Sequence, residues 1–263
     1  MAARSRPIAL VQQGRDPLVD WLLLRGLARE SAHWGDWPEQ LQTARPEDRF
    51  HTLDLPGTGL NRHLRSPACI TGMRQFAEQA ACGLPRPLGL IGLSLGGMVA
   101  LDWALNRPDD CANLVLISSS SGLSRPWRRL RPAQWARVIR MLTQADSDTR
   151  EQAILAITSN RPIPIEVTHQ WQSVQRERPV KRLDVIRQLY AASRYRPPHH
   201  QLPMPALVMA SAGDRLTDWR CSRDLAESLD CHLAVHPSAG HDLPLDDPRW
   251  LIAQLKAYFP IDR

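Results

Sequence analysis

Short apolar runs alternate with amphipathic stretches along most of this 263-residue chain. Six of the runs are typical of buried strands, at residues 20–26, 50–57, 87–94, 112–119, 205–214 and 231–241. Helical periodicity fills several of the stretches between them, at residues 70–82, 95–106, 219–229 and 248–259. Because parallel strands need crossover connections that cover the sheet, this alternation predicts an α/β fold. We expect a mostly parallel sheet of about six to eight strands flanked by helices.

The alternation stops between residues 120 and 201, where only the helical period is present. Four amphipathic segments follow one another there, separated by Pro-rich stretches such as R-P-I-P-I. Several helices between two strands indicate an insertion over one edge of the sheet. The chain therefore divides into a core of residues 1–119 and 202–263 and an inserted helical cap of residues 120–201. A weak strand pattern, P-I-A-L-V-Q at residues 7–12, would be an added edge strand or a loose arm.

The composition is that of a globular protein, with 43% hydrophobic and 23% charged residues. The N-terminal residues lack the apolar core of a secretory signal, and no uncharged apolar run reaches the length of a membrane span. The five cysteines include no C-x-x-C pair, which argues against both a disulfide framework and a zinc site. We therefore expect a cytoplasmic protein that binds neither a metal ion nor a membrane.

The net charge of +6 is unevenly distributed. Residues 125–200 carry fifteen basic and six acidic side chains, whereas the rest of the chain carries eighteen basic and 21 acidic ones. All of the basic excess therefore lies on the helical insertion. No helix-turn-helix, RRM or zinc pattern accompanies it, so we do not expect nucleic-acid binding. The excess is either a solvated Arg-rich face or a surface that attracts an anionic substrate or an acidic partner.

The segment L-I-G-L-S-L-G-G-M-V-A contains the pattern G-x-S-x-G at Gly92, Ser94 and Gly96. The pattern is common by chance, but here it lies between a strand and a helix, which is the context that a nucleophile elbow requires. The glycines allow a tight turn that presents the Ser94 hydroxyl at the end of the sheet, next to the positive end of the helix dipole. A plain helix N-cap is the alternative role. We interpret Ser94 as a nucleophile.

A serine hydroxyl needs a base and an orienting carboxylate to become a nucleophile. Of the nine histidines, His241 alone follows a strand-like run and a Gly. Asp214 ends the preceding run, which gives the order Ser, acid, His of a known catalytic triad. We assign the carboxylate to Asp214 and keep Asp218 in reserve, although Asp218 also suits a helix cap. Asp242 and Asp246 are the other acids considered.

Together these motifs make the chain resemble the α/β-hydrolase superfamily from residue 21 to residue 259. The matching pieces are R-G-L at 25–27, D-L-P-G-T-G at 54–59, G-L-S-L-G at 92–96, G-D-R-L-T at 213–217 and A-G-H-D-L-P at 239–244. The resemblance implies acyl transfer in which Ser94 attacks a carbonyl, His241 moves the proton and Asp214 holds the imidazole. It also implies an oxyanion hole formed by the backbone N–H groups of Leu27 and Leu95.

The first strand-end loop departs from the family pattern. Most members carry His-Gly before the second oxyanion donor, whereas this chain has Arg25-Gly26-Leu27. The donor is a backbone N–H group, and Gly26 keeps the freedom to present it, so hydrolysis should survive the substitution. A buried arginine needs partners, and we expect the carboxylate of Glu30 or Asp54. Arg25 is therefore predicted to support the oxyanion loop, with contact to an anionic substrate as the alternative.

The cap is expected to cover Ser94 and to select the acyl group. Apolar residues at helical spacing are more often plain core than substrate contacts, and the candidates for a lining are Trp127, Trp135, Trp171, Met141 and Ile139. The chain also resembles capped esterases that demethylate a pimeloyl group on an acyl carrier protein, in which a basic cap meets the acidic carrier. Such a contact would first be sought at Arg128, Arg129 and Arg131.

We therefore predict a serine carboxylesterase that acts on a small-molecule ester without a cofactor. An ester or thioester linked to a carrier protein or CoA is the alternative substrate. The same triad serves lactonases, C–C bond hydrolases and perhydrolases, so the subtype stays open. A fold used only as a binding module is the non-enzymatic alternative, although such modules usually lack a triad member.

Overall fold

The structure is a computed structural model that describes residues 19–198 and 201–260. Six parallel strands form one sheet in the order β2-β1-β3-β4-β5-β6. The strands are β1 (Asp20–Leu24), β2 (Arg49–Leu53), β3 (Leu88–Leu93), β4 (Cys111–Ile117), β5 (Ala206–Ser211) and β6 (His232–His236). Each strand overlaps one of the six apolar runs, so the predicted α/β architecture is confirmed. The strand candidate at residues 7–12 lies outside the described residues.

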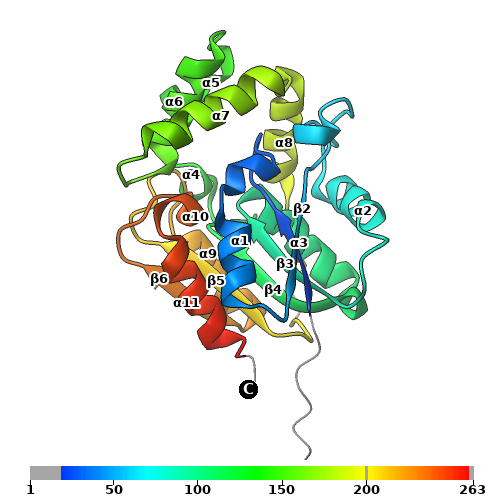
Figure 1. Cartoon of the computed structure of the whole chain (residues 1–263). Helices are drawn as coiled ribbons and strands as arrows, with labels where there is room; N and C mark the ends of the chain where they lie inside the picture. The colour runs from blue at the N-terminus through cyan, green and yellow to red at the C-terminus, as the bar shows by residue number, and fades with distance from the viewer. Residues whose placement is uncertain (1–18, 199–200, 261–263) are drawn as a thin grey trace, which may run out of the picture.

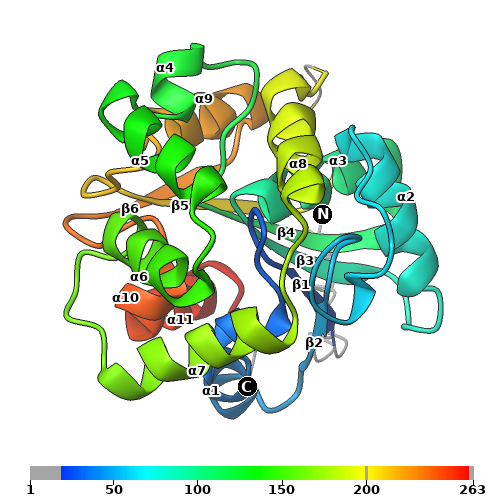
Figure 2. The same ribbon diagram turned by 90° about the horizontal axis from the view of Figure 1, so that it is seen from above.

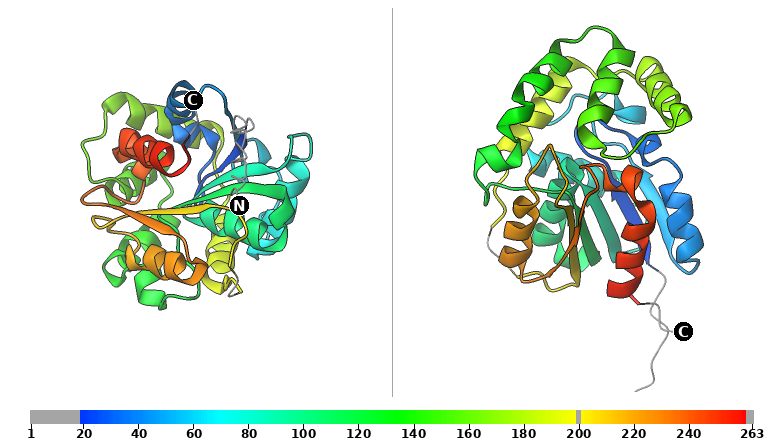
Figure 3. Two further views of the ribbon diagram at one scale, coloured as in Figure 1. Left: turned by 90° about the horizontal axis from the view of Figure 1, so that it is seen from below. Right: turned by 90° about the vertical axis from the view of Figure 1, so that its left-hand side faces the viewer.

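Helices cover both faces of this sheet (Figures 1 and 3). On one face lie α2 (Ile70–Ala80), α3 (Leu95–Asn106) and α9 (Arg220–Leu229). On the other lie α1 (Trp37–Ala44) and α11 (Pro248–Tyr258). The periodic pattern missed α1, because this short helix buries only Trp37 and Leu41. Single turns complete the core, namely η1 (Ser31–Trp34), η2 (Gly59–Asn61), η3 (Pro108–Asp110) and α10 (Leu243–Asp246).

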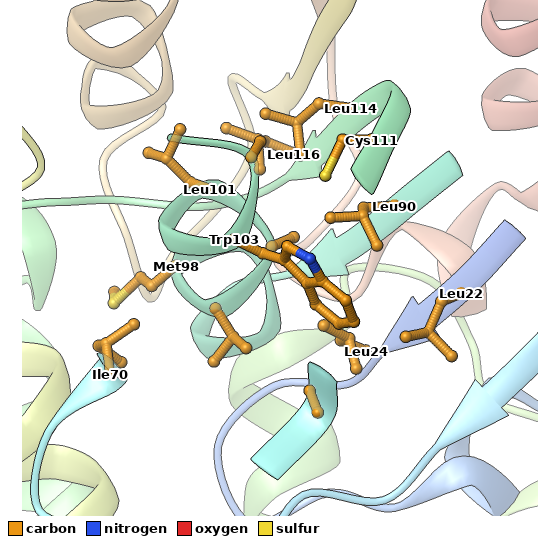
Figure 4. Close-up of a cluster of buried hydrophobic side chains, with 14 of the residues drawn as sticks. Leu22, Leu24, Ile70, Leu90, Met98, Leu101, Trp103, Cys111, Leu114 and Leu116 are labelled. Carbon is orange, nitrogen blue, oxygen red and sulfur yellow. The ribbon is translucent and has the colours of Figure 1, made fainter. Parts of the chain in front are cut away.

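The hydrophobic core consists of two layers, one on each face of the sheet. Successive side chains of a strand point to opposite faces. In β1, Leu22 and Leu24 therefore join the layer around Trp103 of α3, which Figure 4 shows. Trp21 and Leu23 join the layer on the other face. Because β1 is buried on both faces, its sequence is an uninterrupted apolar run rather than an alternation of apolar and polar residues.

Between β4 and β5, the described residues 118–198 and 201–205 form five helices and no strand. They are α4 (Pro126–Arg129), α5 (Pro132–Thr143), α6 (Ser147–Thr158), α7 (Ile165–Glu177) and α8 (Arg182–Arg194). The four predicted amphipathic segments overlap α5 to α8. Figure 1 shows α5 to α8 above one edge of the sheet, and Figure 2 shows them from above, arranged around its centre. This is the edge at which the strands end, where ligands of open α/β sheets are usually held.

Across the two described ranges, no helix combines the length and the apolar character needed to cross a membrane.

Candidate functional site

Ser94 occupies the single residue between the end of β3 and the start of α3. Its backbone has φ 54° and ψ −111°, a conformation that non-glycine residues rarely adopt and that structures retain mainly at functional positions. The Ser94 N–H donates to Ile117 O at 2.8 Å, which fixes the turn to the neighbouring strand β4. The turn therefore holds the Ser94 side chain at the strand-end edge of the sheet.

The two elbow glycines allow this close packing. A Cβ atom on Gly96 would lie 2.1 Å from Leu24 O, and one on Gly92 would lie 2.4 Å from Gly96 O. Both contacts are with backbone atoms, which cannot swing aside as a flexible side chain would. The G-x-S-x-G pattern is thus required by the approach of α3 to β1 and β3.

His241 and Asp214 meet beside this turn, on the loops that follow β6 and β5. His241 Nδ1 donates to Asp214 Oδ2 at 2.7 Å, and both side chains are buried. Asp214 Oδ1 accepts the backbone N–H groups of Leu216 and Thr217, at 2.8 and 2.9 Å. The carboxylate is therefore held from both sides, with one oxygen left for the imidazole.

The other three acids considered for this role have different partners. Asp218 accepts the backbone N–H of Arg220 and pairs with its guanidinium, but the N-cap of α9 is Trp219, so the predicted helix cap at Asp218 is wrong. Asp246 accepts the N–H groups of Asn160 and Gly240. Asp242 binds an arginine, described below. Among these acids, the structure brings only Asp214 within hydrogen-bond distance of His241.

The pKa of His241 is raised above its ordinary value. Burial is the largest influence and lowers it, because burial disfavours the charged imidazolium. The adjacent Asp214 carboxylate outweighs this by charge attraction and by its hydrogen bond. The charge of Asp242 adds to the increase, and that of Arg25 opposes it. His241 is therefore a stronger base than a histidine in water, which suits it to accept a proton.

A cavity of about 540 Å³ connects the predicted site residues. Ser94, His241, Gly26, Leu27 and Leu95 line its floor, so both predicted oxyanion donors border the same space as the serine. Most of the remaining lining residues are apolar, and more than half of these apolar residues come from α5, α6 and α8. Among residues 19–198 and 201–260, no group of three or more His, Cys, Asp or Glu side chains is arranged to hold a metal ion.

The expected apolar lining from the cap is only partly correct. Trp135 and Met141 line the cavity. Trp127 and Ile139 do not, because they lie on the outside, 50% and 62% exposed. Trp171 is instead fully buried against His33 of η1, where it packs α7 onto the core. Helical periodicity marked an apolar face on each helix but could not show which neighbour that face meets.

The partners predicted for Arg25 are wrong. Its guanidinium forms a two-point ion pair with Asp242, at 3.1 Å from Nη1 to Oδ1 and 2.6 Å from Nη2 to Oδ2. Glu30 pairs with Arg178, which directly follows α7, and Asp54 accepts hydrogen bonds from Ser31 and Leu60. Both expected carboxylates are therefore occupied by other groups. The actual partner lies 217 positions away and follows His241 directly.

The three arginines proposed for contact with an acidic partner are half-buried and largely engaged within the chain. Arg128 lies 3.8 Å from Asp224. Arg129 donates to the carbonyl groups of Ala192 and Ser193, at the C-terminal end of α8. Arg131 donates its backbone N–H to Leu216 O.

Two further arginines, Arg150 of α6 and Arg182 of α8, line the cavity and were not singled out in the sequence. Both donate to Gln144 O, at 3.1 and 3.5 Å. Nothing in the local sequence distinguishes them from the many other arginines of the cap.

A buried ion pair that the sequence did not indicate joins the loop after β1 to α6. Arg29 Nη1 lies 2.8 and 2.7 Å from the two carboxylate oxygens of Glu151, whose side chain is completely buried in α6. One residue earlier, the Ala28 N–H donates to Gln188 Oε1 of α8 at 2.8 Å. Helices α6 and α8 therefore both hold the loop that carries Gly26 and Leu27.

The sheet order and the tight strand–Ser94–helix turn are those expected of an α/β hydrolase, and comparison with known sequences agrees. Residues 21–254 match the alpha/beta hydrolase family, which covers most of the chain. The chain belongs to this family.

Several relatives are pimeloyl-[acyl-carrier protein] methyl ester esterases. One from Vibrio vulnificus (strain YJ016) is 34% identical over 122 residues, which is 46% of this chain and 44% of that protein. The alignment thus spans less than half the length of that relative. One from Vibrio campbellii (strain ATCC BAA-1116) is 27% identical over 215 residues, covering 80% of this chain and 82% of that protein.

Among solved structures, an esterase from Exiguobacterium antarcticum superposes with a TM-score of 0.75 at 16% identity, covering 92% of both chains. This likeness shows the shared fold.

Proposed function

We propose that the protein is a serine hydrolase of carboxylic esters, with Ser94 as nucleophile, His241 as general base and Asp214 as the orienting carboxylate. The observation that carries the proposal is the 2.7 Å bond between His241 and Asp214 beside a serine held at positive φ, with serine and histidine lining one cavity. A helix cap alone would need neither the histidine nor the cavity.

In the proposed reaction, His241 Nε2 accepts the Ser94 proton while Ser94 Oγ attacks the ester carbonyl carbon. The resulting oxyanion would accept the backbone N–H groups of Leu27 and Leu95. Collapse breaks the bond to the leaving alcohol, which takes the proton from His241. Water then attacks the acyl-enzyme with the same base, releasing the carboxylic acid and restoring Ser94.

We propose that residues 120–201 act as a cap on a core of residues 1–119 and 202–263. The support is the position of α5 to α8 above the strand-end edge and their share of the cavity lining. Side chains such as Met141, Ile154 and Leu189 would contact the acyl chain. A largely apolar cavity favours an uncharged chain in this position.

A carrier-linked methyl ester is a second candidate substrate, which rests on the named activity of the relatives and on the basic cap. Arg150 and Arg182 support it, because they bring two positive charges to the cavity wall, where both donate to carbonyl groups at the C-terminal end of α5. An acidic carrier would be attracted to this side of the cap. The sequence predicted a carrier contact at Arg128, Arg129 and Arg131. Of these three residues, Arg129 is bound to the end of α8, whereas Arg128 and Arg131 are not.

We also propose that the protein is cytoplasmic. This proposal is supported by the five cysteines, all of which are free thiols.

The test of hydrolysis is turnover of p-nitrophenyl esters of increasing acyl length by the wild type and by Ser94→Ala. We expect the variant to lose at least about 10³-fold in kcat, because no other group replaces the nucleophile. A variant that keeps wild-type turnover would refute the proposal.

The carrier substrate is tested by changing Arg150 and Arg182 to Glu, with Arg107→Glu at the C-terminal end of α3 as a charge-reversal control that does not line the cavity. The double change should slow turnover of a carrier-bound methyl ester and leave a short p-nitrophenyl ester much less affected. The double change would count against a carrier substrate if it slowed turnover of both esters equally. So would Arg107→Glu if it slowed turnover of the carrier-bound ester as much as the double change does.

A further inference from the structure

The ion pair between Arg25 and Asp242 is buried at the site. The two residues are 2% and 4% exposed, and both line the cavity next to His241. Two parallel N–H···O bonds fix the relative orientation of the two groups as well as their distance. A pair with this geometry constrains the backbone on both sides.

The residues next to Arg25 and Asp242 in the chain have roles in the proposed reaction. Arg25 directly precedes Gly26 and Leu27, which carry the proposed oxyanion donor. Asp242 directly follows His241, the proposed base. The pair is therefore a direct side-chain link between the loop that would bind the oxyanion and the loop that carries the imidazole.

Neighbouring groups leave Arg25 little freedom to move. Its guanidinium lies 4.7 Å from the ring centre of Trp34 and 5.9 Å from that of Trp171. Asp242 is fixed as well, because its backbone N–H donates to Thr158 O at the end of α6. The link is thus rigid at both ends and reaches the cap.

We propose that Arg25 is a positioning residue for His241: acting through Asp242, it keeps the imidazole aligned with the oxyanion loop. The proposal rests on the hydrolase function proposed above. It assigns Arg25 no contact with the reacting atoms.

The charges of Arg25 and Asp242 act on the imidazole, so the pKa of His241 is a quantity that reports on the pair. Three charged groups act on the imidazole, namely Asp214, Asp242 and Arg25. Asp242 raises the pKa of His241 and Arg25 lowers it. Replacing Asp242 by Asn leaves the arginine charged and unopposed, because a guanidinium does not lose its proton in proteins. The pKa of His241 must then fall.

The first measurement is the pH dependence of kcat/KM for Asp242→Asn on a p-nitrophenyl ester. We expect the acid limb to move to lower pH, and kcat to fall by about tenfold to a hundredfold from misalignment. Glu151→Gln is the matched control, since it strands the buried Arg29 without removing a charge that acts on His241. Its acid limb should stay at the wild-type pH.

The second measurement separates positioning from stability. The double variant Arg25→Gln with Asp242→Asn removes both charges and leaves neither stranded, so its melting temperature should recover relative to Asp242→Asn. Its kcat should stay low, because the link between the loops is gone. Arg25→Lys keeps the charge but loses the two-point geometry, so kcat should fall while the acid limb stays in place.

A double variant with wild-type kcat would show that the pair only stabilises the fold and would overturn the proposal. An unmoved acid limb in Asp242→Asn would do the same. If Asp242→Asn does not fold, the double variant and Arg25→Lys still decide the question. Loss of turnover in Ser94→Ala alongside an unaffected double variant would reject the positioning role alone, whereas turnover retained by Ser94→Ala would reject both proposals.

Discussion

Asp214 and His241 share a buried hydrogen bond of 2.7 Å, although 27 positions separate them in the chain. Each stands on the loop after its own strand, and β5 and β6 are adjacent in the sheet. The pairing of two neighbouring parallel strands therefore brings these loops together. The other carboxylate oxygen is bound by two backbone N–H groups, which leaves Asp214 one orientation from which to hold the imidazole.

This relationship predicts a large effect of Asp214→Asn on hydrolysis. The amide keeps the shape but no longer stabilises an imidazolium, so kcat should fall by about 10⁴-fold. Asp218→Asn, the same change in an acid that pairs with Arg220, should have little effect on kcat. The measurement is kcat for a p-nitrophenyl ester in both variants. A large loss in Asp218→Asn with little in Asp214→Asn would reverse the assignment.

The raised pKa of His241 also predicts how stability depends on pH. A group whose pKa is higher in the folded state stabilises the fold fully below its unfolded pKa, and this contribution is lost as pH rises through the folded pKa. The contribution of His241 should therefore be complete below about pH 6.5 and disappear above that value. Urea unfolding between pH 5.5 and 9 measures it. In Asp214→Asn the contribution should be smaller, and an unchanged pH dependence would contradict the role of the carboxylate.

The buried pair of Arg29 and Glu151 predicts a stability effect far from the reacting atoms. Glu151→Gln leaves a buried guanidinium without its counter-charge, which should lower the free energy of unfolding by about 3–5 kcal/mol. Asp148→Asn on the same helix breaks the exposed pair with Arg176 and alters a long hydrogen bond from Ser147 Oγ, and we expect less than about 1 kcal/mol. Chemical denaturation of the two variants is the test. Equal losses would mean that the buried pair does not hold α6 to the core.

The elbow predicts a sharp difference between two glycines. Gly96→Ala places a Cβ atom 2.1 Å from Leu24 O, so α3 or β1 must move. We expect a loss of about 3 kcal/mol or more in stability and of about 10²-fold in kcat. Gly83→Ala meets no atom within 4 Å and should change stability by less than about 1 kcal/mol. Thermal melting and ester hydrolysis compare the two. A tolerated Gly96→Ala would contradict the packing described here.

Most of the fold could be predicted from the sequence because its signals are local. Strands buried on both faces produce apolar runs, and α3 could be bounded exactly as residues 95–106, because the elbow begins it. The pairing of His241 with Asp214 was also predictable, since parallel strands bring their end loops to one edge. Helix α1 was missed because only two of its residues face the core.

Contacts that depend on long-range packing could not be predicted in this way. The partner of Arg25 was sought on nearby loops, but the structure supplies Asp242 from the other end of the chain. Trp171 was one of the candidates for the cavity lining, but it packs on η1 because α7 turns its apolar face to the core. In each case the sequence showed that a side chain needs a partner without showing which element comes near it.

The central claim is that Ser94 is the nucleophile, and covalent labelling with a fluorophosphonate probe tests it most directly. Intact-mass analysis should show one adduct on the wild type, mapped by peptide digestion to Ser94, and none on Ser94→Ala. Ser120→Ala removes another hydroxyl from the cavity lining and should label as the wild type does. Labelling that persists in Ser94→Ala, or that is lost only in Ser120→Ala, would contradict the account.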